Sequence, residues 1–141
     1  MESSPSFRLI LYWTRLIIKF AAQFDPQSFH LNTETASHSF YGGLIASGLH
    51  TISICFRLFI EQGLLEKSSM GSPGIDELRW QAPVRPGDTL HTRVKVIDVK
   101  PSSKRDDRGI LRLKYSAINQ DEVTVSSFIV NHLIRHSPST E

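Results

Sequence analysis

The segment at residues 44–65 constrains the fold of this chain more than any other stretch, because it is apolar on nearly every side. Its large apolar side chains include Leu49, Ile52, Ile54, Phe56, Leu58, Phe59, Ile60 and Leu64. A helix that is apolar all round belongs in the middle of a structure and not on its surface. We therefore predict a long buried helix over this segment, with Ser47 as its N-cap. The Gly48 N–H would then be one of the free donors of the first turn.

Four strand-like runs follow the apolar segment, at residues 75–82, 90–96, 111–117 and 123–134. Apolar and polar residues alternate in the second and third runs, which is the period of a half-buried strand. Short connections join consecutive runs, and residues 119–121 have the composition of a hairpin turn. This order predicts an antiparallel meander. A helix followed by such strands indicates an α+β protein whose sheet wraps against the buried helix.

The N-terminal part of the chain is predicted to hold a second helix. Residues 7–12 are expected to form a short strand or an extended lead-in, and helical spacing of apolar residues starts at Trp13. Thr14 is a suitable N-cap for that helix. Because Pro26 disfavours the helical conformation at the residue before it, the helix is expected to end just before Asp25. Asp25 is thus predicted at a helix exit, where its side chain can point into a cleft.

Length and composition fit one globular domain. The chain has 141 residues, which predicts a single domain over residues 1–141, with a flexible lead-in at residues 1–12 and a flexible tail at residues 136–141. The net charge is +2 and the basic residues are dispersed, which excludes the basic patch typical of nucleic-acid binding. Cys55 is the only cysteine, so an intrachain disulfide is excluded. We predict that Cys55 is a small buried hydrophobe.

The apolar N-terminal stretch FRLILYWTRLIIKF does not have the features of a targeting segment. Arg8, Arg15 and Lys19 interrupt it, and no small-residue cleavage site follows. It is also shorter than the roughly 20 apolar residues that cross a bilayer. We therefore expect a cytoplasmic protein without a membrane partner. The histidines have no HExxH or other metal-ligand spacing, so we expect no metal site.

Asp25 and His30 are the candidate acid and base of the chain. Addition of water across a double bond conjugated to a thioester needs a base, an acid and a donor for the enolate oxygen. The irregular segment at residues 26–43, with one helical turn expected near residues 34–37, can fold both side chains round one water. The Gly48 N–H, at the positive end of a buried helix, can supply the third group. The spacing by itself is more typical of a helix-ending Asp and a surface His than of a catalytic pair.

Three ordered motifs resemble the MaoC-like acyl dehydratases, the single-hotdog family that includes the (R)-specific enoyl-CoA hydratases. Asp25 and His30 match the Asp and His of the family motif D-x-N-P-x-H, and Phe40 matches the Phe that follows it. The later I-A-H-G motif is matched here by IASG at residues 45–48. The resemblance is closest in detail to members that carry FDPQ-x-FHL and GLIASG-x-HT. PVRPGDTL at residues 83–90 also resembles a turn common in the family, and the resemblance covers roughly residues 14–135.

The resemblance implies a hotdog fold, in which an antiparallel sheet wraps a long central helix, and a homodimer. It also implies a thioester tunnel with Asp25 and His30 around the water and Gly48 as the oxyanion donor. The acyl carrier would be CoA or acyl carrier protein, with no metal or redox cofactor. The candidate substrate-binding residues are Phe40, Ile45, Ser47, His50 and Arg85.

Some residues keep a plainer alternative. His50 is expected on the buried helix, where a core or interface position competes with substrate contact. Arg85 is either a turn residue or a ligand of a CoA phosphate. Asp88 is predicted to close the Pro-Gly turn through a local hydrogen bond. Trp13 and Trp80 are predicted as core or dimer-contact aromatics.

Two alternatives to a hydratase remain open from the sequence. A hotdog thioesterase would use a carboxylate to activate water at the carbonyl carbon. A non-catalytic acyl-thioester-binding hotdog protein is favoured by Gln27, where the family motif has Asn, and by the unusual N-terminal stretch. Ser47 also replaces the His that precedes the glycine in most members. Whether Asp25 and His30 face one shared tunnel separates the catalytic hypotheses from the binding one.

Overall fold

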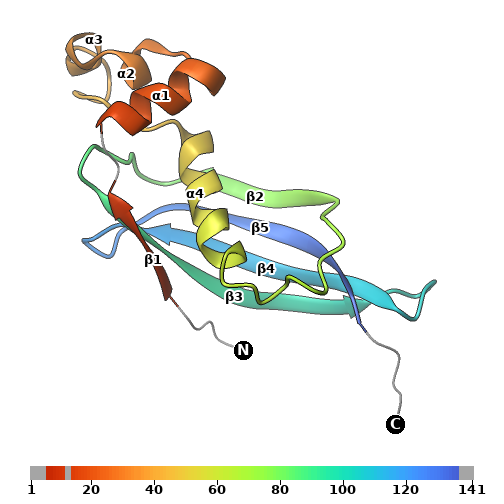
Figure 1. Ribbon diagram of the computed structural model, residues 1–141. Helices are drawn as coiled ribbons and strands as arrows, with labels where there is room; N and C mark the ends of the chain where they lie inside the picture. The colour runs from red at the N-terminus through yellow and green to blue at the C-terminus, as the bar shows by residue number, and fades with distance from the viewer. Residues whose placement is uncertain (1–5, 12–13, 137–141) are drawn as a thin grey trace.

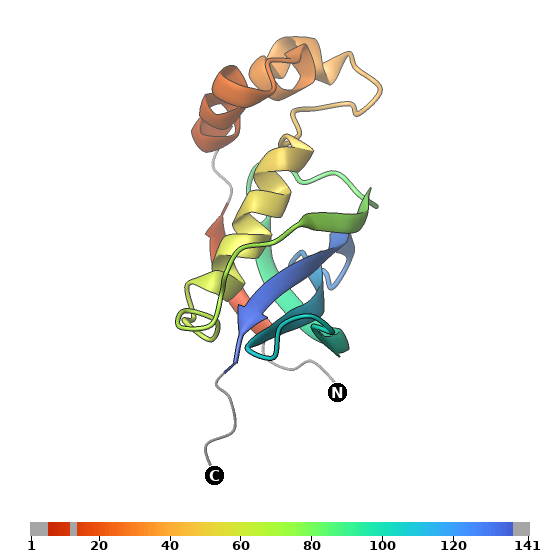
Figure 2. The same cartoon turned by 90° about the vertical axis from the view of Figure 1, so that its right-hand side faces the viewer.

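The computed structural model describes residues 6–11 and 14–136, with side chains from residue 14 onward. The elements in chain order are β1 (Ser6–Leu11), α1 (Thr14–Phe24), α2 (Ser28–Leu31), α3 (Thr33–Ser37), α4 (Gly48–Ile60), β2 (Gly74–Trp80), β3 (Thr89–Pro101), β4 (Arg108–Ile118) and β5 (Thr124–Arg135). The strands form one antiparallel sheet against which α4 packs, and α1, α2 and α3 gather at one end (Figure 1). The turned view shows the sheet curving around α4 (Figure 2). The predicted α+β arrangement is confirmed.

The central helix α4 is shorter than the predicted segment at residues 44–65, and it begins where its cap was predicted. Ser47 is the N-cap, and its side chain accepts the Leu49 N–H. The residues before it cannot continue the helix because their backbone pairs elsewhere. The Ile45 N–H donates to Phe29 O at 3.2 Å, and the Ala46 N–H donates to Val84 O at 2.8 Å. These pairings tie the approach to α4 to other parts of the fold.

The sheet has the order β1-β3-β4-β5-β2, so the predicted meander is only partly right. Strands β3, β4 and β5 do follow one another as antiparallel neighbours. The prediction for β2 is wrong, because β2 pairs with β5 and not with β3, its successor in the chain. The reason is that β3 already has β4 on one side and β1 on the other. Strand β2 therefore occupies the edge of the sheet beside β5, and residues 81–88 carry the chain back from β2 to β3.

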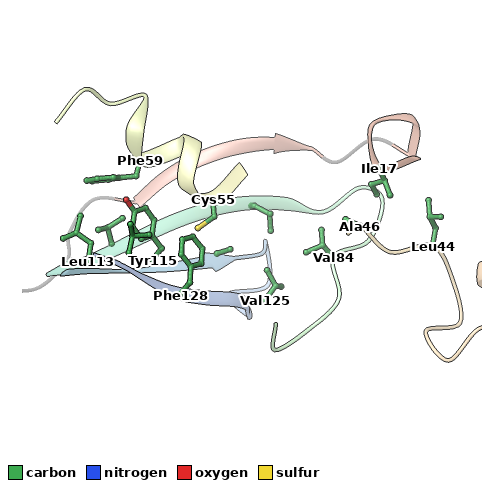
Figure 3. Packing of buried hydrophobic residues seen from close by; sticks show 14 of the residues in the cluster. Ile17, Leu44, Ala46, Cys55, Phe59, Val84, Leu113, Tyr115, Val125 and Phe128 are labelled. Carbon is green, nitrogen blue, oxygen red and sulfur yellow. The ribbon is translucent and has the colours of Figure 1, made fainter. Parts of the chain in front are cut away.

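The core lies between α4 and the sheet. Cys55 and Phe59 of α4 pack toward Tyr115 and Phe128, and Figure 3 shows these side chains gathered between the helix and the strands. The rings of Tyr115 and Phe128 stack with centroids 5.0 Å apart. Cys55 is fully buried, so its predicted place in the core is confirmed. Burial of one large apolar side chain stabilises a fold by about 1.5–3 kcal/mol, so this cluster holds α4 firmly in place.

The N-terminal helices form the end of the molecule where the cleft lies. Helix α1 ends at Phe24, as the proline predicted, and α3 matches the single turn expected near residues 34–37. The short helix α2 was not predicted. None of the helices in the described ranges is long and apolar enough to cross a membrane. Residues 6–11 of the predicted lead-in form β1, whereas residues 1–5, residues 12–13 (with Trp13) and the residues after His136 lie outside the described residues.

Candidate active site

The fold brings Asp25 and His30 together. Asp25 directly follows α1, and its N–H still bonds to Ala21 O at 2.8 Å, so its side chain leaves the last turn of the helix. His30 lies in α2 and is only 4% exposed. Its Nε2 lies 3.3 Å from Asp25 Oδ2. Pro26 stops α1 and allows α2 to turn the ring back toward the carboxylate. The two side chains thus share one site, as the sequence predicted.

The orientation of the His30 ring is fixed by a backbone carbonyl. Nδ1 lies 2.8 Å from Ile45 O. Because a carbonyl oxygen only accepts hydrogen bonds, Nδ1 carries the hydrogen, and Nε2 of a neutral ring is an acceptor. Nε2 faces the Asp25 carboxylate, which in its ionised form is also only an acceptor. Their close approach is therefore favourable when a proton lies between them or when one water donates to both.

Asp25 is held as a carboxylate by its neighbours. Ser47 Oγ donates to Oδ2 at 2.7 Å, and Gln27 Nε2 donates to Oδ1 at 2.6 Å. Partial burial raises the pKa of Asp25, but the hydrogen bonds from Ser47 and Gln27 and the nearby His30 outweigh it. The net effect is a pKa below the usual 3.8. Asp25 is therefore ionised at neutral pH. The contact of Gln27 with Asp25 was not predicted. Gln27 stands where the family motif has Asn, and here its side chain holds the Asp25 carboxylate.

Gly48 lies beside this pair at the start of α4. The N–H groups of a first helical turn have no partner within the helix, and here the Ser47 side chain takes that of Leu49. Among the described residues no acceptor takes the Gly48 N–H. The N-terminal end of a helix carries a partial positive charge. The Gly48 N–H is therefore a donor suited to an oxygen that gains negative charge.

These groups line one cleft of about 630 Å³. Asp25, His30 and Gly48 all contribute to its wall. The rest of the wall is mostly apolar and includes Phe29, Phe40, Ile45, Leu49, Trp80 and Val84. Clefts of roughly 300–1,000 Å³ with apolar walls and a few convergent polar groups are typical sites for small molecules and cofactors. This cleft has the size and chemistry to hold an acyl group beside an acid–base pair.

Three of the predicted substrate-binding residues lie at the cleft or against its polar groups. Phe40 lines the cleft with a side chain that is 95% exposed. Ile45 also lines it, and its carbonyl holds His30. Ser47 is fully buried and donates a hydrogen bond to Asp25, so it helps to position the carboxylate. Contact of these residues with a substrate stays a prediction.

His50 and Arg85 do not line the cleft. The His50 ring stacks on Phe20 with centroids 4.4 Å apart, and burial lowers its pKa to about 4. Arg85 donates from Nη2 to Tyr41 O at 2.6 Å. Its own N–H bonds to the Asp88 carboxylate at 2.9 Å, which confirms the predicted closure of that turn. Substrate contact by His50 or Arg85 stays a prediction as well.

Trp80 is a cleft residue that the sequence did not indicate. It was predicted as a core or dimer-contact aromatic, yet in the structure it is 51% exposed and lines the cleft next to Gly48. No local spacing signals this contact, because it joins the end of β2 to the start of α4. Within residues 6–11 and 14–136, no group of three or more His, Cys, Asp or Glu side chains is placed to hold a metal ion.

Comparisons with known proteins agree with this architecture. Residues 12–115 match the sequence model of the MaoC like domain. The uncharacterized protein YdeM of Bacillus subtilis (strain 168) is 39% identical over 119 residues, which are 84% of this chain and 83% of that protein. The MaoC-like dehydratase from Rhodospirillum rubrum has a similar structure, with a TM-score of 0.85 and 36% identity over 99% of this chain and 96% of that one.

An (R)-hydratase from A. caviae involved in PHA biosynthesis shares the fold, with a TM-score of 0.73. Its identity to this chain is 21%, over 97% of this chain and 98% of that one. The family match extends over most of the chain, and the structural match extends over nearly all of it. The chain therefore belongs to the MaoC-like dehydratase family and has its hotdog fold.

Proposed function

We propose that this protein adds water reversibly to 2-enoyl thioesters and, in reverse, dehydrates 3-hydroxyacyl thioesters. The observation that carries the proposal is the 3.3 Å approach of His30 Nε2 to Asp25 Oδ2, in the cleft that Gly48 also lines. Membership of a family with a dehydratase and an (R)-hydratase among the similar structures supports the reaction class. Because Asp25 and His30 face one cleft, a purely binding role is less favoured.

The reaction follows from the placement of these groups. The thioester carbonyl oxygen accepts the Gly48 N–H, and a water donates to Asp25 and His30. As the water oxygen bonds to C3, one water proton passes to the pair, and the electrons of the C2–C3 double bond move toward the carbonyl oxygen as an enolate. The pair then returns a proton to C2, and the thioester carbonyl re-forms. The product contains both hydrogens and the oxygen of the water.

Each polar group has a separate task. His30 is held by Ile45 O so that Nε2, the atom that exchanges a proton, faces the water. Asp25 stays ionised and can stabilise a protonated imidazole. A positioned acid–base group commonly contributes about 10²–10⁴-fold to a rate, and one oxyanion donor about 10²–10³-fold. The three groups together are sufficient for a strong effect without any group from outside the chain.

The carrier and the assembly are also proposals. We propose CoA or acyl carrier protein as the carrier, with no metal or redox cofactor, and a homodimer as the assembly. Light scattering on the purified chain measures the mass in solution and tests the assembly directly. Addition of a chelator tests the cofactor proposal, because the hydration rate is expected to stay unchanged.

The decisive experiment follows the loss of enone absorbance when the protein meets crotonyl-CoA. Asp25→Asn and His30→Ala are expected to lower kcat by about 10²–10⁴-fold. Asp106→Asn and His38→Ala are matched controls, because both side chains are exposed and neither lines the cleft. Both controls are expected to keep the wild-type rate.

Other outcomes point to the alternatives. Release of free CoA thiol together with the loss of absorbance would make the protein a thioesterase, because hydrolysis of the thioester also destroys the conjugated chromophore, whereas hydration releases no thiol. Hydration that survives in both Asp25→Asn and His30→Ala would show that the reaction occurs elsewhere. Tight binding of linear, longer and branched enoyl thioesters without turnover of any of them would favour an acyl-binding role.

A further inference from the structure

Trp80 lies directly against Gly48 in the cleft. A methyl group added to the Gly48 Cα would overlap Nε1 and Cε2 of the indole and come within 2.9 Å of its Cδ1. The ring therefore packs on the backbone at the point where the proposed oxyanion donor begins α4. Only a glycine allows an aromatic ring this close. The indole therefore forms the wall of the cleft beside Gly48.

The position of the indole is set by a strand and not by a loose loop. Trp80 is the last residue of β2 and pairs with Ser126 of β5. The Ser126 hydroxyl donates to the preceding carbonyl, Arg79 O, at 2.9 Å. The following N–H, that of Gln81, donates to Val125 O at 2.9 Å. The backbone on both sides of Trp80 is thus fixed to the sheet.

The catalytic pair is also close to Gly48. Ser47, the residue before it, donates to Asp25, and His30 lies 3.3 Å from the same carboxylate oxygen. A thioester whose carbonyl oxygen accepts the Gly48 N–H is therefore bounded by the acid–base pair and by the Trp80 ring. C2 is bonded directly to the carbonyl carbon, so a substituent on C2 is the branch of the acyl chain that comes nearest to the indole. Atoms from C4 onward lie farther from Gly48.

We propose that Trp80 is a specificity-determining residue that restricts the cleft to acyl thioesters without a branch at C2. This inference rests on the function proposed above, since the Gly48 N–H is what brings the carbonyl beside the indole. A linear enoyl chain is flat and can lie along an aromatic ring. A methyl group on C2 needs the space that the ring occupies. One such group in a well-packed pocket commonly changes kcat/KM by about 10–200-fold.

Two isomeric substrates test the inference, namely 2-pentenoyl-CoA and 2-methyl-2-butenoyl-CoA, which have the same number of carbons. The wild type is expected to prefer the linear isomer in kcat/KM by about tenfold or more. Trp80→Ala is expected to bring the ratio close to one, and Trp80→Phe, which keeps an aromatic wall, is expected to retain most of the preference. Trp80→Leu gives the same comparison where the alanine variant does not fold. An unchanged ratio in the folded Trp80→Ala or Trp80→Leu variant would overturn the inference.

Binding of saturated isomers separates this inference from the proposed function. Butyryl-CoA and isobutyryl-CoA cannot be hydrated, and they differ only in the branch at C2. Calorimetry on the wild type is expected to show tighter binding of butyryl-CoA, and the preference is expected to vanish in Trp80→Ala. If the protein has this binding preference but hydrates neither 2-pentenoyl-CoA nor 2-methyl-2-butenoyl-CoA, the proposed function is wrong and the role of Trp80 stands. If the protein hydrates both of these isomers equally well, the proposed function stands and only the role of Trp80 is wrong.

Discussion

Ser47 Oγ donates a hydrogen bond to Asp25 Oδ2 at 2.7 Å and accepts one from the Leu49 N–H at 3.2 Å. One hydroxyl can do both because it has one hydrogen and two lone pairs. The same side chain therefore caps α4 and positions the carboxylate. This contact holds the Asp25 carboxylate close to the Gly48 N–H, and a thioester must bridge these two groups in the proposed reaction.

Removal of the Ser47 hydroxyl is expected to affect both stability and activity. Ser47→Ala loses the cap and should lower the free energy of unfolding by about 0.5–2 kcal/mol, measured by urea denaturation. The hydrogen bond from Ser47 also helps to lower the pKa of Asp25, so that pKa rises in the variant. The acid limb of the pH–rate profile for crotonyl-CoA is therefore expected to move to higher pH. Ser47→Thr keeps the hydroxyl and should retain the wild-type limb. An unmoved limb in the alanine variant would show that Asp25 does not depend on this contact.

The contact between Gly48 and Trp80 predicts a strong coupling between these positions. Gly48→Ala forces the indole aside and should lower the free energy of unfolding by about 1–3 kcal/mol. In a Trp80→Ala background the same change should cost much less, with a coupling energy of about 0.5–3 kcal/mol in a double-mutant cycle. Gly74→Ala is the matched control, because a methyl group there meets no atom within 4 Å. Additive costs at positions 48 and 80 would contradict the packing described here.

Two buried histidines predict how stability depends on pH. Burial lowers the pKa of His50 from 6.5 to about 4 and also lowers that of His132. Below pH 6.5 the unfolded chain therefore binds protons that the folded chain does not. The free energy of unfolding should fall as the pH drops from about 6.5 toward 4, by at most roughly 1.4 kcal/mol per pH unit for each histidine.

Urea denaturation at several pH values measures this slope. His50→Phe, whose ring can still stack on Phe20, is expected to have a smaller slope than the wild type. His38→Ala removes an exposed histidine and is expected to leave the slope unchanged. A wild-type stability that stays constant from pH 7 to pH 5 would mean that neither buried ring is held in its neutral form.

A buried hydrogen bond away from the cleft predicts a mutation that changes stability without changing activity. The Tyr115 hydroxyl lies 2.8 Å from His132 Nε2, and both side chains are buried. Tyr115→Phe leaves the histidine nitrogen without this partner and should cost about 1–3 kcal/mol of unfolding free energy. The rate of enoyl hydration should not change, because neither residue lines the cleft. Tyr115→Phe combined with His132→Phe should recover part of the stability, and a further loss would argue against this account.

Much of this fold was readable from local sequence. The apolar segment predicted the central helix, Ser47 its cap and Pro26 the end of α1, since caps and breakers act on neighbouring residues. The four strand-like runs predicted strands β2 to β5. The motif that holds Asp25 and His30 predicted that the two would meet, and a short irregular segment was enough to bring them together. Helix α2, which makes the turn between them, was missed because four residues carry no clear period.

The sequence by itself therefore determined most of the elements and the choice of Asp25 and His30 as the candidate acid–base pair. Only the tertiary structure decided which distant segments meet. It placed β2 beside β5, Gln27 and Ser47 on the Asp25 carboxylate, and Trp80 on Gly48. The physical reason is the distance along the chain over which each interaction acts. Hydrophobic period, capping and proline geometry act over a few residues, whereas strand order and the contacts around a cleft depend on how whole elements pack.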